Sequence, residues 1–485
     1  MIQVKAPRRV SGDACEQSRK PEGPAHMSIN FSPELIRKYD VAGPRYTSYP
    51  TAVQFTPAFG ARELAAQRSV IAGRVTGGPL SLYVHIPFCA KVCFYCGCTK
   101  VVTNNRARGA DYLARLLQEI PRRAALHGGA REVRQLHLGG GTPTFLSTDQ
   151  LAELLATLRA SFHFAPDCET SIEVDPRTVM PDTIHALRAL GFNRVSLGIQ
   201  DFDPRVQLAV NRVQSESATV AVVAAAREAE FESVSFDLIY GLPLQSQASF
   251  SRTIAKTIAL RPNRLSLFNY AHLPHMFKTQ RQIDATQLPT AEQKLALLGA
   301  AIGQLSDAGY DYIGMDHFAL PEDELSKARA AGTLHRNFQG YSTHAECDLI
   351  GLGMSAISSF DDCFVQNTKE LDDYQTRIDN GEIPVTRGYA LSEDDRLRRE
   401  IIMGLACQGV VDRADVERRW GIDFDRYFAG EIASLAGMAD DGLIAFDNRC
   451  IRVLTPGMLL LRNICMNFDH YLRQSDTQQR FSRAI

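Results

Sequence analysis

Four cysteines lie within ten positions of the sequence, in the stretch HIPFCAKVCFYCGC at residues 85–98. Cys89, Cys93 and Cys96 form the pattern C-x3-C-x2-C, and Cys98 follows as an additional C-x-C. Structural zinc sites usually have two paired knuckles, and no second Cys or His pair follows this one. Three thiolates on one loop can hold three irons of a cubane cluster and leave the fourth iron open to a substrate. The spacing therefore favours an iron–sulfur cluster, with structural zinc as the alternative.

The cysteine loop must be positioned by strands and helices, and the sequence alternates between segments that predict one or the other. Short apolar and β-branched runs predict buried strands at residues 80–88, 135–143, 169–176, 194–202, 233–243 and 264–274. Apolar residues at helical spacing predict helices at 111–126, 149–162, 182–192, 218–231, 249–260 and 291–305. Six successive βα units indicate an α/β fold with a parallel sheet. The number favours an incomplete barrel over a closed eight-stranded one, although an open sheet also fits the periodicity.

Polar residues and glycines follow several of these predicted strands. The cysteine loop follows the first, the run Gly139–Thr142 the second, and Glu173, Gln200 and Asp237 end later ones. In βα proteins the C-terminal strand ends share one pocket, which predicts that these residues meet. Glu173 and Asp237 lie in apolar runs, where an unpaired carboxylate is costly, and a structural salt bridge is the alternative for each. Together with Arg212 they suit a ligand that carries a ribose, an amine and a carboxylate.

Composition narrows the class of partner. The chain has 485 residues, which predicts more than one domain. Its net charge of -2 and 22% charged residues give no reason to expect nucleic-acid binding, so we expect a small-molecule ligand. No run of about 18 apolar residues predicts a membrane span. Residues 1–27 have no apolar signal-peptide core and predict a disordered extension, with Met27 as a possible start. Without a signal peptide or a membrane span we expect a cytoplasmic protein. In that reducing compartment, clustered cysteines bind metals or do redox chemistry more often than they form structural disulfides.

The pattern changes after about residue 376. Residues 376–485 predict a mainly helical domain with one short β excursion at GLIAFDNRCIRVL, which is typical of a winged-helix-like arrangement. Winged helices often bind DNA, but this segment has no basic excess. We therefore interpret it as a cap over the mouth of the barrel.

Several motifs together resemble the radical S-adenosylmethionine (SAM) superfamily and, within it, the oxygen-independent coproporphyrinogen III oxidase (HemN) family. They are GPRYTSYPTA (43–52), YVHIPFC (83–89), CFYCGC (93–98), LHLGGGTPTFL (136–146), IEVDPR (172–177), GIQDF (198–202), DLIYGLP (237–243), FNYAHLP (268–274), GMDHFA (314–319), HRNFQGY (335–341) and RNICMNFD (462–469). The resemblance spans residue 28 to the end. It implies a partial (βα)6 barrel at 56–375 behind an N-terminal arm at 28–55 that covers the active site.

The resemblance also implies roles for single residues. Cys89, Cys93 and Cys96 would ligate a [4Fe–4S] cluster, and Tyr83, Glu173 and Asp237 would act at the catalytic centre. A first SAM would be lined by Tyr83, Gly140, Glu173 and Ile357. A second SAM would be held by Tyr95, Gly141, Thr142, Gln200, Arg212, Asp237 and Ala271.

The implied reaction is oxidative decarboxylation of two propionates of coproporphyrinogen III to vinyl groups, which gives protoporphyrinogen IX for haem biosynthesis. A 5'-deoxyadenosyl radical made from SAM would start it. The implied partners are a flavodoxin- or ferredoxin-like electron donor and an unknown acceptor, and we expect a monomer. Arg45 and Arg336 are candidates for contacts to propionates. A haem-binding chaperone on the same scaffold is the alternative, and the intact C-x-C and the RYTSYP arm speak against it.

Overall fold

The computed structural model describes residues 31–72, 78–127, 130–447 and 449–474, so the predicted extension at 1–27 lies outside the described residues. Its main feature is a 12-stranded sheet with the strand order β16-β15-β14-β13-β1-β4-β5-β6-β7-β8-β10-β9. The six predicted strands form its centre in chain order, and each is parallel to the next. They are β1 (Leu80–Ile86), β4 (Glu132–Gly140), β5 (His163–Val174), β6 (Arg194–Gln200), β7 (Ser233–Tyr240) and β8 (Arg264–Asn269).

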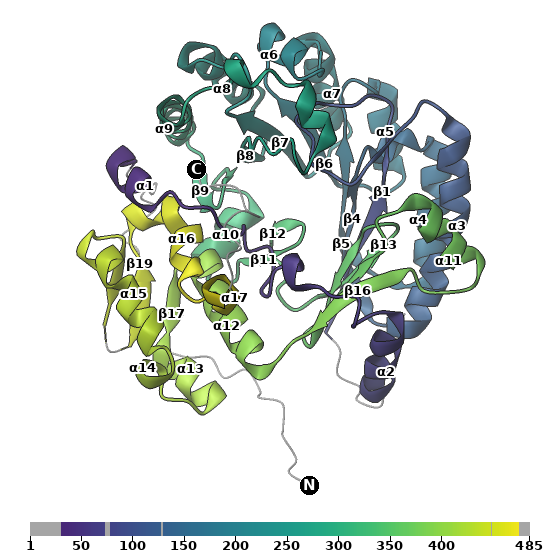
Figure 1. Ribbon diagram of the computed structural model, residues 1–485. Helices are drawn as coiled ribbons and strands as arrows, with labels where there is room; N and C mark the ends of the chain where they lie inside the picture. The colour runs from purple at the N-terminus through teal and green to yellow at the C-terminus, as the bar shows by residue number, and fades with distance from the viewer. Residues whose placement is uncertain (1–30, 73–77, 128–129, 448, 475–485) are drawn as a thin grey trace.

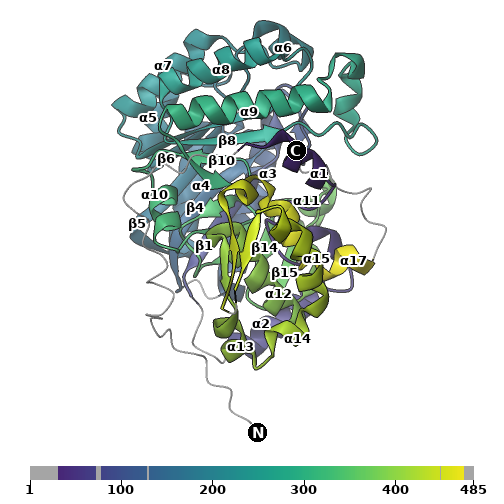
Figure 2. The same cartoon turned by 90° about the vertical axis from the view of Figure 1, so that its left-hand side faces the viewer.

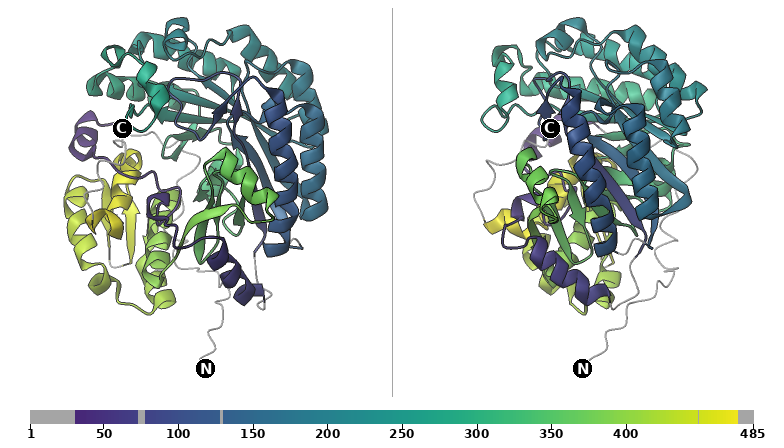
Figure 3. Two further views of the ribbon diagram at one scale, coloured as in Figure 1. Left: turned by 45° about the vertical axis from the view of Figure 1, so that its right-hand side comes forward. Right: turned by 90° about the vertical axis from the view of Figure 1, so that its right-hand side faces the viewer.

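The predicted helices cover the outer side of this curved sheet, as Figures 1 and 3 show. They are α3 (Arg106–His127), α4 (Thr148–Ser161), α5 (Pro181–Ala189), α7 (Glu216–Glu228), α8 (Gln247–Leu260) and α9 (Ala291–Asp307), with the short α6 (Pro204–Ala209) before α7. Local signals start them: Ser147 and Gln150 form a capping box before α4, and Thr290 and Gln293 form one before α9. The prediction of a partial (βα)6 barrel is confirmed.

The sheet is wider than the six predicted strands. β13 (Asp348–Leu352) pairs parallel to β1. β14 (Ile357–Ser359), β15 (Cys363–Asn367) and β16 (Val385–Ala390) then continue antiparallel, and β9 (Asp311–Gly314) with β10 (His317–Ala319) extend the other edge. β16 lies beyond residue 376, so the sheet reaches into the segment that the sequence assigned to the C-terminal domain. Small elements complete this part: β2 (Phe88–Cys89), β3 (Val101–Val102), α10 (Glu324–Ala330), β11 (His335–Asn337), β12 (Gly340–Ser342) and α11 (Leu371–Asp379).

Residues 391–474, which we call the C-terminal unit, supply most of a second hydrophobic cluster, which also includes Tyr46 and Tyr49 of the N-terminal arm and residues between 313 and 341. The helices are α12 (Glu393–Met403), α13 (Arg413–Trp420), α14 (Phe424–Tyr427), α15 (Ala429–Asp440), α16 (Leu461–Met466) and α17 (His470–Gln474). β17 (Val410–Asp412), β19 (Cys450–Val453) and β18 (Ile444–Phe446) form an antiparallel sheet in that order. Helices backed by a small three-stranded sheet match the predicted winged-helix-like arrangement.

Residues 31–55, called the arm below, begin with α1 (Pro33–Tyr39) and run between the C-terminal unit and the large sheet, as Figures 1 and 3 show. The Tyr46 hydroxyl donates to Asp469 at 2.9 Å, and Arg462 donates to the carbonyl of Pro44 at 2.9 Å. On the other side, Arg45 donates to the carbonyl of Asn269 at the end of β8. The arm therefore joins the two parts before α2 (Ala61–Ala72) leads into β1, at the lower edge in Figure 2.

None of the described helices combines the length and the apolar character that a membrane crossing requires.

Candidate active site

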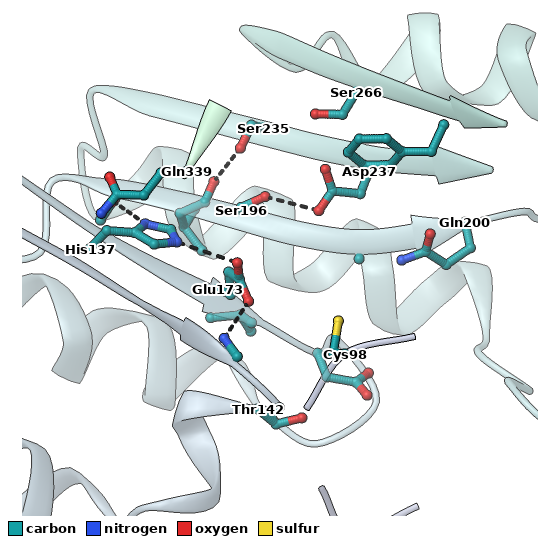
Figure 4. A pocket seen from close by; sticks show the side chains of 18 of the residues that line it. Cys98, His137, Thr142, Glu173, Ser196, Gln200, Ser235, Asp237, Ser266 and Gln339 are labelled. Carbon is teal, nitrogen blue, oxygen red and sulfur yellow. Dashed lines mark hydrogen bonds and ion pairs between the residues drawn. The ribbon is translucent and has the colours of Figure 1, made fainter. Parts of the chain in front are cut away.

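A cavity of about 540 Å³ opens inside the curved sheet, and most of the predicted site residues line it. Every central strand except β1 contributes to its wall, and the cysteine loop closes one end. Figure 4 shows Glu173, Gln200 and Asp237 facing this space from three neighbouring strands, with Cys98 and Thr142 nearby. The predicted residues on its wall are Cys89, Cys93, Tyr95, Cys96, Gly140, Gly141, Thr142, Glu173, Gln200, Arg212 and Asp237.

The residues Cys89, at the end of β2, and Cys93 and Cys96, in the loop between β2 and β3, line the cavity together. Three cysteines on one stretch of the wall can supply three thiolate ligands to a metal centre. A separate group, His344, Glu346 and Cys347, has ligand atoms within 4.8 Å of one another.

Two arginines compensate charge at the cysteine loop. Arg177 Nη2 lies 3.4 Å from Cys93 Sγ, and Arg212 Nη1 lies 3.5 Å from the same sulfur. Asp175 holds both guanidinium groups, at 2.6 Å from Arg177 and 3.4 Å from Arg212. An anionic cluster with three thiolates fits an end of the cavity that already carries two fixed cations.

The thiols differ in how readily they ionise. A hydrogen bond from Cys98 and the nearby Lys100 lower the pKa of Cys96 to about 6 against the effect of burial. Burial raises the pKa of Cys89 to about 11, although a hydrogen bond from Thr142 opposes this. Cys98 thus lies on the cavity wall as a hydrogen-bond partner of a predicted ligand.

The glycines of the second strand end allow close approach of the backbone. Gly140 has φ +115°, and a Cβ there would lie 2.6 Å from the ring of His85. A Cβ on Gly141 would lie 2.6 Å from the carbonyl oxygen of Pro87, which is backbone and cannot move aside easily. Positions 140 and 141 therefore have no room for a side chain. The glycine run Gly139–Gly141 thus packs directly against the segment that leads into the cysteine loop.

Glu173 is held in place by two hydrogen bonds, which Figure 4 shows as dashed lines. The amide of Gly140 donates to Glu173 Oε2 at 3.1 Å, and His137 Nε2 lies 3.3 Å from Oε1. The Glu173 side chain nevertheless stays 44% exposed to the cavity. It has no arginine or lysine partner within salt-bridge distance among the described residues, so the salt-bridge alternative reduces to the His137 contact.

Asp237 lies across the cavity on β7. Ser196 donates to Asp237 Oδ2 at 3.4 Å. Burial, together with the charge of Glu173, raises the pKa of Asp237 to about 6. Gln200 next to it has φ +68°, a left-handed conformation that is unusual for this residue type. Two carboxylates and an amide thus converge on one space, with Arg212 close to Gln200. This arrangement can accept hydrogen bonds from hydroxyl and ammonium groups.

Three predicted residues do not reach the cavity wall. The Tyr83 ring stacks on His137 with centroids 5.9 Å apart, and its hydroxyl bonds to His85. The Ala271 carbonyl accepts from Gln280, which also donates to the carbonyl of Tyr95. Ile357 lies on β14 beside Gly351, the partner of Tyr83 in β13. These residues lie beside the wall, and Tyr83 is the register partner of His137, so the two side chains are on the same face of the sheet.

Sequence reasoning missed functional residues that the structure brings to the cavity. His137 lies inside a predicted strand, where nothing in the sequence assigns it a role, yet it lines the cavity and contacts Glu173. Arg177 was not considered separately, although it follows Asp175 by two residues at a predicted strand end, which is a usable signal. Gln339 and Tyr341 come from the β11–β12 hairpin, and no local pattern connected that hairpin with the cavity.

The chain is similar to known proteins over most of its length. The model of the Radical SAM superfamily matches residues 83–256, and the model of the HemN C-terminal domain matches residues 391–460. The oxygen-independent coproporphyrinogen III oxidase of Pseudomonas aeruginosa is 52% identical over 461 residues, which cover 94% of this chain and 99% of the relative. The enzyme of the same name from Escherichia coli is 50% identical, over 95% of this chain and 99% of the relative.

A solved structure has the same fold. The crystallised coproporphyrinogen III oxidase (HemN) from Escherichia coli, described as a radical SAM enzyme, superposes with a TM-score of 0.87 at 47% sequence identity. The match covers 92% of this chain and all of the other. It therefore includes the barrel, the arm and the C-terminal unit.

Proposed function

The chain belongs to the oxygen-independent coproporphyrinogen III oxidase family of the radical SAM superfamily, and we propose below how its residues carry out that reaction. The enzyme converts two propionate side chains of coproporphyrinogen III to vinyl groups, without oxygen, in haem biosynthesis. Family membership includes a [4Fe–4S] cluster and SAM as cofactors.

We infer that Cys89, Cys93 and Cys96 are the cluster ligands. The observation that carries this inference is the set of three thiols on the cavity wall beside Arg177 and Arg212. When bound, the cluster supplies the electron that cleaves SAM to a radical able to take hydrogen from a propionate. The positive charges of the two arginines stabilise an anionic group at this end of the cavity, and Asp175 fixes the orientation of both side chains.

We propose that SAM lies along the wall formed by β4 to β7. Glu173, fixed by Gly140 and His137, accepts hydrogen bonds from the amino group or ribose of a first molecule. Tyr83, which stacks on His137, and Ile357, which lies beside the β13 partner of Tyr83, support this place from next to it. A second SAM molecule is held by Gln200, Arg212 and Asp237 with Tyr95, Gly141, Thr142 and Ala271. Its support is that Asp237, Gln200 and Arg212 line the same cavity as Tyr95, Gly141 and Thr142.

The arm and the C-terminal unit complete the enclosure in this proposal. A radical must be kept from water, and the arm crosses from the end of β8 to the C-terminal unit, where it can close the mouth. We place the boundary between barrel and C-terminal unit after β16, near residue 390. We further propose a cytoplasmic monomer that takes electrons from a flavodoxin- or ferredoxin-like protein.

The test is an anaerobic assay of cluster-reconstituted protein with SAM, a reductant and coproporphyrinogen III. Cys93→Ala should abolish absorption near 400 nm, 5'-deoxyadenosine formation and protoporphyrinogen formation together. Cys168→Ala removes a thiol from β5 that does not line the cavity and is the matched control. A Cys93→Ala protein that keeps its absorption would refute the ligand assignment. A wild-type protein that cleaves SAM without converting the porphyrinogen would favour the haem-chaperone alternative.

A further inference from the structure

A second, small cavity of about 40 Å³ lies where the arm, the edge of the large sheet and the C-terminal unit meet. Arg45 of the arm, Arg336 of β11 and Arg462 of α16 line it. Three guanidinium groups face one lining carboxylate, Asp316, whose nearest oxygen is 3.9 Å from Arg45. The lining residues therefore carry an excess of positive charge in a space closed off by three parts of the chain.

Arg336 is the least compensated of the three. The residue is only 5% exposed, and its Nε and Nη1 atoms are buried without a hydrogen-bond partner. Its guanidinium lies 4.7 Å from the centre of the Tyr341 ring, a contact that satisfies no N–H group. Buried charges and unpaired donors are costly, so natural proteins pair them. The arrangement calls for an anionic acceptor from outside the chain.

The other two arginines add to the positive potential. Burial and the neighbouring Arg45 lower the pKa of Arg462 to about 10, which leaves it charged at neutral pH. His317 between the two cavities remains neutral, because burial and Arg336 lower its pKa to about 3. The positive charge of the small cavity therefore comes from the arginines, and His317 adds none.

Aromatic side chains separate this cavity from the large one. Phe268, His317 and Tyr341 line the large cavity and contact each other edge to face, at 6.2 Å and 5.2 Å between ring centres. On their other side, Arg45 lies over Phe268 at 5.7 Å and Arg336 over Tyr341. An anion in the small cavity would therefore be one ring thickness away from a molecule in the large cavity.

We propose that the small cavity binds a propionate carboxylate of the tetrapyrrole, with Arg336 as its principal donor and the aromatic residues against a pyrrole ring. The inference rests on the proposed function and adds a substrate-binding site to it. A cavity of 40 Å³ exceeds the roughly 10–15 Å³ that one water needs, so it accepts a group of a few atoms and excludes a ring. The carboxylate of SAM offers the same chemistry, and the experiment must separate the two.

The test compares Arg336→Met and Arg336→Lys in the reconstituted, cluster-loaded enzyme. Loss of a charge-assisted hydrogen bond should raise the KM for coproporphyrinogen III by roughly 10- to 100-fold in Arg336→Met, and Arg336→Lys should recover part of it. The KM for SAM should stay unchanged. The melting temperature of Arg336→Met should stay equal or rise, since an apolar side chain replaces an uncompensated buried charge. Arg252→Gln, which is 65% exposed on α8, is the control.

A second arm uses the tetramethyl ester of coproporphyrinogen III, which has no carboxylate charge. Wild-type enzyme should bind the free acid more tightly than the ester, and Arg336→Met should reduce that preference. A lower melting temperature with unchanged KM would show that Arg336 is structural and would overturn the proposal. A raised KM for SAM alone would assign the cavity to SAM and also overturn it. If the wild type does not convert coproporphyrinogen III at all, the proposed function fails instead.

Discussion

Replacing Asp237 by asparagine should stabilise the protein in a pH-dependent way while it impairs the reaction. Burial raises the pKa of this carboxyl from 3.8 to about 6, so the folded state prefers the protonated form. Folding therefore becomes less favourable as the pH rises from about 3.8 through 6 and the buried group ionises. Asparagine has nearly the same shape and cannot ionise, so it removes this cost.

The size of the effect follows from the two pKa values. Their difference, 6 minus 3.8, corresponds to at most about 3 kcal/mol at roughly 1.4 kcal/mol per pH unit. Asp237→Asn should thus gain up to about 3 kcal/mol in the free energy of unfolding at pH 7.5, and only about 1 kcal/mol at pH 4.5. The cavity admits water, and partial hydration makes these values upper limits.

Urea unfolding followed by far-UV circular dichroism, without SAM and under anaerobic conditions, measures this difference. Trp420, the single tryptophan, lies in α13, so its fluorescence reports on the C-terminal unit separately. Asp167→Asn, at an exposed position of β5, is the control for general charge effects. An Asp237→Asn advantage that is absent, or equal at both pH values, would refute the reasoning. The variant should also lose SAM-dependent activity, since Asp237 then no longer accepts a strong hydrogen bond.

Three further predictions concern other parts of the chain. Gly141→Ala should abolish cluster assembly, seen as loss of absorption near 400 nm, because its Cβ would lie 2.6 Å from the Pro87 carbonyl; normal absorption would contradict the close approach. Glu431→Gln should destabilise the C-terminal unit by about 3 kcal/mol or more in tryptophan-detected unfolding, since it breaks a buried pair with Arg398 at 2.9 Å. Burial disfavours ionisation of Glu169, but a histidine hydrogen bond and arginine charges outweigh it and lower its pKa from 4.5 to about 2. The ionised Glu169 therefore stabilises the folded state above pH 4.5, and this stabilisation is lost as the pH falls toward 2. Glu169→Gln should lower the free energy of unfolding by up to about 3 kcal/mol at pH 7 and by little at pH 2.5, and an equal loss at both pH values would refute this prediction.

The sequence predicted the central strands and helices because both have strong local periodicity. It did not predict β13, although this strand lies next to β1. The run DLIGL is only five residues long and follows a long stretch of short elements, so nothing local indicates its parallel partner. Pairing between distant segments depends on tertiary packing, which a single sequence does not display.

The sequence predicted which residues meet at one cavity where residue type and position limit the possibilities. Three cysteines on one loop and carboxylates at strand ends do so, and the structure brings them to one cavity. The depth of a side chain is harder to predict. Tyr83 shares a face of the sheet with its neighbour His137, yet only His137 lines the cavity, because the side chains packed around each ring decide how far it reaches. Arg336 was named from its sequence context, but its unpaired burial appears only once three distant segments are folded together.

The arm near the start of the chain is anchored mainly by residues near its end. Tyr46 is synthesised 423 residues before its partner Asp469. Domains tend to fold in order as the ribosome releases them. During translation the barrel can therefore form with its mouth uncovered, and the arm finds its anchor only when the C-terminal unit has emerged.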